Sequence, residues 1–221
     1  MVSQKRVFRN KYVSVSPSMQ PRQDLLDDAF IRELNMEEYA REACEKTIRE
    51  TPLLPEDSTE EKRRREIAYL NIRWFMATLL DRMDRTGMYS GLEARVPFAD
   101  YRIVEYVFNV PWKIKCPDGI VKGLLRHACE GILPKEILWR KKSPYPKTYD
   151  PNYETMLANE LKDVLASPNA PIQTFLDKKK VLRFLDAPSD YGKPWYGQLM
   201  AGPQMIAYML QINYWLEKYK I

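Results

Sequence analysis

The sequence has few of the residues on which several common catalytic chemistries depend. Its 221 residues include one histidine, His127, and three cysteines, Cys44, Cys116 and Cys129. With a single histidine, the chain cannot hold a histidine-rich metal site or a catalytic triad built on another histidine. The pair of His127 and Cys129 is more typical of core packing. We expect no metal site. Three widely spaced cysteines indicate reduced thiols in a cytoplasmic protein rather than a disulfide framework.

Long apolar runs are also missing. Asn71 and Arg73 interrupt the best candidate, so no stretch is long enough to cross a bilayer, and the N-terminus MVSQKRVFRNKY lacks the apolar centre of a signal peptide. The formal net charge of +5 arises from 35 basic and 30 acidic side chains, an excess too small to indicate nucleic-acid binding. We therefore expect neither a membrane nor a nucleic acid as partner.

Complete nucleotide-binding motifs are absent as well. Gly192 and Gly197 have the separation of a phosphate loop, but Gln198 follows where that motif requires lysine. Neither a G-x-G-x-x-G fingerprint nor a G-x-S-x-G elbow occurs. The chain therefore carries no complete nucleotide site, and we expect no cofactor bound to it alone.

Helical patterns occupy most of the chain, and few strands are expected. We interpret residues 1–23 as a loose lead-in and residues 24–221 as one mainly helical domain. Apolar residues recur at three- and four-residue steps in each predicted helix. The predicted helices cover residues 24–34, 36–48, 58–84, 101–110, 122–131, 153–166, 178–185 and 203–219. In the last of these, the residues predicted to pack in the core are Met205, Tyr208, Met209, Ile212 and Trp215.

The longest predicted helix ends in a cluster of charges. It begins with a capping box formed by Ser58 and Glu61, and its charge run EEKRRRE is expected to be solvated. Its centre, IAYLNIRWFMATLL, is apolar on nearly every side, which predicts a buried helix. In the last turn, Asp81 and Asp84 share a face beside Arg82, where carboxylates oppose the helix dipole. The cluster forms either a set of surface ion pairs or part of a functional site.

Two sequence blocks carry a resemblance to a known family. MDRTGMYSGLEARVPFAD, residues 83–100, is similar to a D-R-x-x-M-x-x-G-[LV]-E-[AV]-R-[VS]-P-F-[LA]-D pattern, in which Asp100 is expected to cap the next helix. GIVKGLLRHACEGILPKEILWRKKSPYPK, residues 119–147, resembles a Gly-x-x-Lys-x-x-Leu-Arg helix followed by Leu-Pro-x-x-Ile and Arg-x-Lys. Both blocks occur in this order in the synthetase domain of glutamine-dependent asparagine synthetases. The resemblance covers residues 24–150.

The resemblance implies a fold and a set of partners. Family members have a glutaminase domain with an N-terminal cysteine nucleophile and an ATP site with an S-G-G-x-D-S loop, neither of which occurs here. It therefore implies the helical C-terminal portion of an α/β adenine-nucleotide α-hydrolase-like (ATP-pyrophosphatase) synthetase domain, without its nucleotide-binding sheet. Such a fragment is expected to be inactive alone, to partner the glutaminase and nucleotide-binding parts, and to self-associate through exposed apolar faces.

The resemblance also implies a reaction and the residues that serve it. Family enzymes convert aspartate, ATP with Mg²⁺ and glutamine-derived ammonia to asparagine, AMP and pyrophosphate through a β-aspartyl adenylate. The family's essential lysine falls on Lys142, where it would neutralise charge on the phosphates and the acyl-adenylate oxygen. Asp81 and Asp84 would act as an acid–base or substrate-orienting pair in the same cavity as Lys142. The candidate substrate- or pyrophosphate-binding residues are Arg82, Glu93, Arg95, Lys122, Arg126 and Arg140.

Alternatives remain open at this stage. Glu93 and Arg95 either contact substrate or form a buried ion pair that fixes their loop. Lys122 and Arg126 share a helix face that meets pyrophosphate or is simply solvated. The whole chain also fits another amide-forming adenylating synthetase of the β-lactam synthetase type, or a helical binding module that uses the basic segment RKKSPYPK, where prolines keep the backbone extended.

Overall fold

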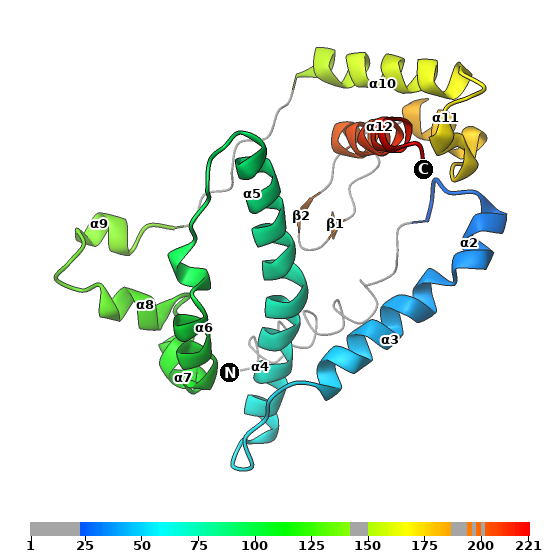
Figure 1. The fold of residues 1–221 in the computed structure, drawn as a ribbon. Coiled ribbons are helices and arrows are strands. Elements are labelled where there is room, and N and C mark those ends of the chain that lie inside the picture. The colour runs from blue at the N-terminus through cyan, green and yellow to red at the C-terminus, as the bar shows by residue number, and fades with distance from the viewer. Residues whose placement is uncertain (1–22, 142–149, 187–193, 196–197, 200–201) are drawn as a thin grey trace. The chain divides into compact units, whose positions relative to one another are not determined.

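The computed structural model describes residues 23–141, 150–186, 194–195, 198–199 and 202–221 (Figure 1). Within these residues the chain is mainly helical, as predicted, and its strands are a two-residue antiparallel pair, β1 (Pro194–Trp195) and β2 (Gln198–Leu199). The chain divides into two compact units, residues 1–42 with 146–221 and residues 43–145, and the division falls within α3 (Met36–Arg49). No helix in the described ranges is long and apolar enough to cross a membrane.

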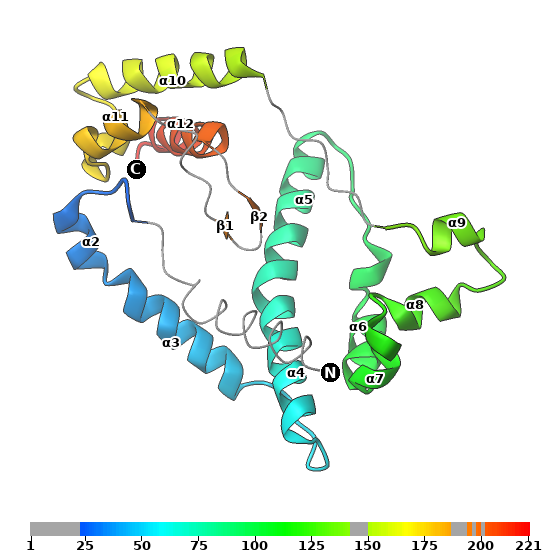
Figure 2. The ribbon, with the colours of Figure 1, turned by 180° about the vertical axis from the view of Figure 1, so that it is seen from behind.

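The first unit contains most of the buried apolar side chains. Its elements are α2 (Asp28–Leu34), the start of α3, α10 (Pro151–Ala166), the 3₁₀ turn η4 (Pro171–Thr174), α11 (Lys178–Asp186) and α12 (Gly202–Tyr219). Helices α10 and α12 pack side by side (Figures 1 and 2). The core cluster consists of Leu25, Leu157, Leu161, Leu165, Ile172, Leu176, Val181, Phe184, Leu185, Met205, Ile206, Met209 and Leu216.

Polar contacts cap helices of this unit and join its two chain segments. Asp27 caps α2 by accepting from the backbone N–H groups of the second and third residues after it, at 2.8 and 3.0 Å. Leu26 forms a β-bridge with Leu176, and the Lys180 ammonium group donates to the Leu26 carbonyl at 2.9 Å. The N-cap residue of α11, Asp177, accepts two backbone N–H bonds, and the bond from Lys180 contributes most to lowering the pKa of its carboxyl.

The prediction for α12 is correct for only part of its residues. Met205 and Met209 are buried, whereas Tyr208 is 42% exposed and Trp215 is 50% exposed. The buried stripe instead includes Asn213, whose side-chain oxygen accepts from the Ile172 backbone N–H at 3.4 Å. An 18-residue helix presents only one face to α10 and η4, so its other face carries aromatic side chains into solvent.

Leu161→Ala is expected to destabilise the first unit by about 2–5 kcal/mol. The Leu161 side chain is fully buried in α10, so its removal loses apolar burial and leaves a cavity. Urea unfolding measured by hydrogen exchange of the α10 and α12 amides tests this. Leu182→Ala, the same truncation at a side chain 37% exposed, is the control. Equal losses in the two variants would contradict a core centred on Leu161.

A continuous helix runs through the second unit. It comprises α4 (Thr59–Leu70), a π-helical turn η1 (Asn71–Met76) and α5 (Ala77–Tyr89). Ser58 caps it by accepting from the Glu61 N–H at 3.2 Å, as the capping-box pattern predicts. The Glu61 carboxylate, however, accepts from the backbone N–H of Trp112 at 3.1 Å. It therefore links this helix to another part of the unit, a contact that the local pattern did not predict.

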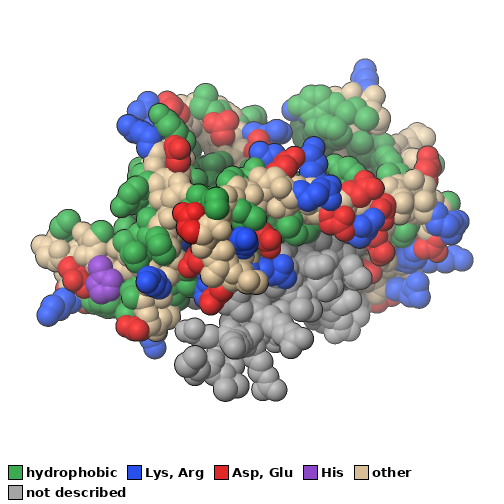
Figure 3. Space-filling view, turned by 90° about the horizontal axis from the view of Figure 1, so that it is seen from below, with side chains coloured by type: hydrophobic (Ala, Val, Ile, Leu, Met, Phe, Trp, Pro, Cys, Tyr) green, Lys and Arg blue, Asp and Glu red, His purple; other side chains and the backbone are tan. Residues whose placement is uncertain are grey.

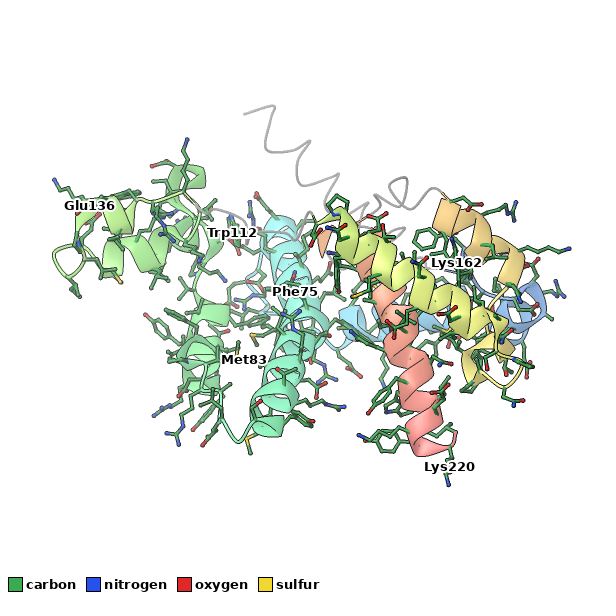
Figure 4. The ribbon with its side chains drawn as sticks, turned by 90° about the horizontal axis from the view of Figure 1, so that it is seen from above. Phe75, Met83, Trp112, Glu136, Lys162 and Lys220 are labelled. Atoms are coloured by element: carbon green, nitrogen blue, oxygen red, sulfur yellow. The ribbon has the colours of Figure 1, made fainter. Side chains whose placement is uncertain are left out.

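The expectation that this helix is buried is wrong for the chain as it stands. Trp74 is 37% exposed, Phe75 38% and Met83 48%, and only Arg65 and Leu70 are buried along its whole length. Figure 4 labels Phe75 and Met83 on this helix. An apolar surface all round needs neighbours on every side, and the described residues cover only part of it. The Trp74 indole donates to Thr47 Oγ1 of α3 at 3.1 Å, which fixes one such neighbour.

Short helices complete the second unit. In chain order they are η2 (Pro97–Ala99), α6 (Tyr101–Asn109), α7 (Trp112–Lys115), η3 (Pro117–Gly119), α8 (Gly123–Ala128) and α9 (Lys135–Leu138). Gly123 is buried, and a Cβ there would lie 2.4 Å from the Pro117 ring, so the contact between η3 and α8 requires glycine. This close contact sets the direction in which α8 leaves η3.

A buried arginine holds α6 against α4. The Arg65 guanidinium lies 2.7 Å from Asp57, and both side chains are 7% exposed. It also donates to the Phe108 carbonyl at 3.2 Å and to Asn109 Oδ1 at 3.3 Å. The expectation that the EEKRRRE run is entirely solvated is therefore wrong at Arg65, because the Arg65 guanidinium group bonds the C-terminal end of α6. Burial, followed by the nearby Arg65 charge, lowers the pKa of Lys115, which caps the same helix end.

Candidate functional site

The charge cluster at the end of α5 is exposed, and its two carboxylates differ. Asp81 accepts from the Arg85 guanidinium at 2.9 Å, one helical turn away. Among the described residues, no hydrogen bond or ion pair reaches the Asp84 carboxylate or the Arg82 guanidinium. Asp81 is thus engaged in the surface ion pair that the pattern allowed, whereas the described residues provide no such partner for Asp84.

A tight turn leads from α5 into the strongly matched block. The Leu92 N–H donates to the Gly87 carbonyl at 2.9 Å, and a Cβ at Gly87 would lie 2.6 Å from the Leu92 oxygen. Gly91 has φ +70°, a conformation that favours glycine. These two glycines allow the chain to turn sharply where α5 ends, and the matched block continues from this turn.

Glu93 and Arg95 form an ion pair in this block, but an exposed one. The Arg95 guanidinium donates to both Glu93 oxygens, at 3.2 and 3.3 Å, and the side chains are 83% and 64% exposed for arginine and glutamate. The alternative that Glu93 and Arg95 form a buried ion pair is therefore wrong. Two residues of an extended segment that point the same way pair without being enclosed. Their role toward a substrate stays a prediction.

Asp100 caps α6, as predicted. Its Oδ1 accepts from the Arg102 backbone N–H at 2.9 Å, and the Arg102 side chain donates to both carboxylate oxygens at 2.9 and 2.7 Å. The Arg102 side-chain bond is the main cause that lowers the pKa of the Asp100 carboxyl. Arg102 also lines a shallow cavity of about 500 Å³ on α6 with residues up to Pro111, none of which is a predicted site residue.

The two cations of the second block have different environments. Lys122 is exposed and has φ +59° just before α8, and among the described residues its ammonium group has no hydrogen bond. Arg126 is half-buried and donates to backbone carbonyls of Val121, Leu138 and Arg140. The two side chains therefore do not form one solvated pair.

Lys142 lies outside the described residues, so its predicted pairing with Asp81 and Asp84 stays a prediction. The described range before it ends at Lys141, and both Arg140 and Lys141 are exposed. Sequence reasoning did not find the Arg65–Asp57 pair, the π-helical turn or the contacts of Arg126. The run of arginines in EEKRRRE was the one sequence signal for the Arg65–Asp57 pair. The run itself does not show which arginine is buried, because that depends on the partner in the fold.

Comparison with known proteins identifies the class to which this chain belongs. The family model described as asparagine synthase matches residues 3–217, nearly the whole length. The chain is a member of the asparagine synthase family. This confirms the resemblance noted in the two sequence blocks.

Individual relatives carry more specific names. The chain is 48% identical over 205 residues to asparagine synthetase [glutamine-hydrolyzing] 3 of Bacillus subtilis, covering 92% of this chain and 33% of that protein. It is 49% identical over 67 residues to the rat asparagine synthetase [glutamine-hydrolyzing], which covers 29% of this chain and 12% of that protein. The chain thus spans about a third, or less, of the length of these curated relatives.

Proposed function

We propose that this chain is the helical C-terminal part of a glutamine-dependent asparagine synthetase, which joins ammonia to aspartate at the expense of ATP. The observation that carries the proposal is the 48% identity over 92% of the chain to an enzyme so named. The proposed catalytic residues are Lys142, with Asp84 and Asp81 at the end of α5. The proposed contacts to substrate or pyrophosphate are Arg82, Glu93, Arg95, Lys122 and Arg140.

The remaining parts of such an enzyme are the proposed partners. Large apolar side chains stand exposed in the second unit, and hydrophobic side chains (green) lie open on the face that Figure 3 shows. Exposed apolar area of this extent is typical of an interaction surface. We propose that the nucleotide-binding part of the synthetase domain covers it, with the glutaminase domain beyond. In the second unit the large exposed apolar residues include Trp74, Phe75, Met83, Leu92, Phe98 and Tyr101.

In the proposed reaction, the described residues would contribute positive charge. No group of three His, Cys, Asp or Glu side chains within them is arranged to hold a metal ion. We derive no step through the Mg²⁺ that accompanies ATP. What this part contributes is positive charge near the phosphates and a carboxylate near the incoming amine.

The test is the reaction itself, measured with the full-length protein. We expect formation of asparagine, AMP and pyrophosphate in equal amounts from aspartate, ATP, Mg²⁺ and glutamine or ammonia. An adenylating synthetase for another acid would release pyrophosphate with that acid and not with aspartate. Salt-sensitive binding to heparin or RNA, without pyrophosphate release from any acid, would instead support a binding module.

Asp84→Asn is expected to lower asparagine formation about tenfold. Loss of one charge that orients an amine or its proton is worth roughly 1–2 kcal/mol when solvent screens it, and 1.36 kcal/mol is a factor of ten. Ammonia-dependent turnover of the full-length enzyme measures the effect. Asp81→Asn is the comparison, and we expect it to cost less, because that carboxylate already pairs with Arg85. A larger loss in the Asp81 variant would reverse the assignment.

A further inference from the structure

The Arg126 side chain binds the backbone that leads into the basic segment. Its Nε donates to the Val121 carbonyl at 2.9 Å, its Nη1 to the Leu138 carbonyl and its Nη2 to the Arg140 carbonyl at 3.4 Å. The guanidinium also lies over the Trp139 ring, 5.3 Å from its centre. One side chain on α8 therefore contacts three consecutive residues, 138 to 140, where α9 ends.

Other contacts fix the same three residues. Leu138 is buried, and the His127 ring, next to Arg126 on α8, meets the Trp139 ring edge-on at 6.3 Å between centres. His127 is itself held by Glu130, 3.0 Å from its Nδ1. Figure 1 shows α8 and α9 joined by a long connection, and Figure 4 labels Glu136 on α9. Packing and hydrogen bonds from α8 thus converge on the end of α9.

Only arginine can make this set of contacts. Its planar group carries five N–H donors in a fixed fork and stacks on aromatic rings, whereas lysine offers a single ammonium point. Three of the five N–H donors of Arg126, one on each nitrogen, already donate to carbonyl oxygens. Most of the guanidinium therefore faces the backbone, which argues against the predicted contact with pyrophosphate.

We infer that Arg126 is a positioning residue. It fixes the path of residues 138–140, and with it the backbone position from which the chain continues to Lys142, two residues after Arg140. The inference rests on the proposed function for the role of Lys142. It acts through the backbone and not by touching substrate. The Val121 carbonyl, just before the start of α8, is the third acceptor that holds the guanidinium in place.

The test uses Arg126→Ala and Arg126→Lys in the full-length protein. We expect kcat for aspartate-dependent pyrophosphate release to fall about 10- to 100-fold in both, with KM for ATP within about twofold, because displacing a reacting group by about 1 Å costs on this order. Added guanidinium chloride at millimolar concentration should restore part of kcat in Arg126→Ala, since it can fill the vacated site. Arg32→Ala and Arg32→Lys, at an exposed arginine on α2, are the controls.

Different outcomes separate this inference from the proposed function. A raised KM for ATP with unchanged kcat would show that Arg126 binds phosphate, and unchanged kinetics would show that it is only packing; either overturns the inference. If the wild-type enzyme released no pyrophosphate with aspartate, the proposed function would fail by itself. In that case, hydrogen exchange at residues 135–141 still tests whether Arg126 holds this segment. We expect exchange to rise at least about tenfold in Arg126→Lys, and unchanged exchange would overturn the anchoring.

Discussion

Replacing Lys142 with alanine in the full-length protein is expected to lower asparagine formation by about 100-fold or more. A donor that stabilises charge developing on a transition state contributes roughly 3–4 kcal/mol in a site that excludes water. The loss should fall on aspartate-dependent pyrophosphate release, because in the proposed reaction that step creates the acyl-adenylate. Glutamine hydrolysis, which the proposal assigns to another domain, should stay within about twofold. Product formation measured for each half-reaction separates the two.

Lys141→Ala is the matched control for this prediction. It removes the same charge from the neighbouring residue of the basic segment, so a general electrostatic effect would lower turnover equally in both variants. Normal asparagine formation by the Lys142 variant would refute the assignment. A larger loss in the Lys141 variant would move the assignment by one residue.

Arg65→Met is expected to destabilise the second unit by about 3–5 kcal/mol. The change leaves the Asp57 carboxylate buried without its cation, and removes the donor to the Phe108 carbonyl. Breaking one side of a buried ion pair costs this much because the remaining charge cannot be resolvated. Hydrogen exchange of the α4 and α6 amides, followed through a urea series, measures the loss where it occurs.

Arg63→Met provides the comparison for this second prediction. Arg63 lies on the same helix, is 47% exposed and pairs with Glu66 at 3.2 Å, so its loss should cost less than about 1 kcal/mol. A double variant, Arg65→Met with Asp57→Leu, should recover part of the stability, since no buried charge remains. Equal destabilisation by the Arg63 and Arg65 changes would show that the pair between Arg65 and Asp57 is not specifically stabilising.

Local chemistry made much of the secondary structure predictable. Ser58 and Asp100 cap their helices by bonding N–H groups two or three residues ahead, which are contacts that a short sequence window contains. Most other predicted helices lie within a few residues of those observed. The family was predictable for a similar reason, because the two matched blocks are short and contiguous in the chain.

The environment of each charged side chain was much less predictable. Arg63 and Arg65 belong to one charge run, yet the first is exposed and the second is buried against a helix end 43 residues away. Arg126 was grouped with Lys122 by helical spacing, although its three carbonyl partners lie outside the turn that the two share. Periodicity gives the face on which a side chain lies, but not what covers that face.

By itself the sequence determined most of the helices, the caps at Ser58 and Asp100, and membership of the asparagine synthase family. Only the tertiary structure decided that Arg65 is buried, that Glu61 bonds Trp112 and that Arg126 holds the end of α9. The physical reason is distance along the chain. Helix capping and helical periodicity depend on residues within about one turn of each other, whereas burial and long-range hydrogen bonds depend on which segments meet in space.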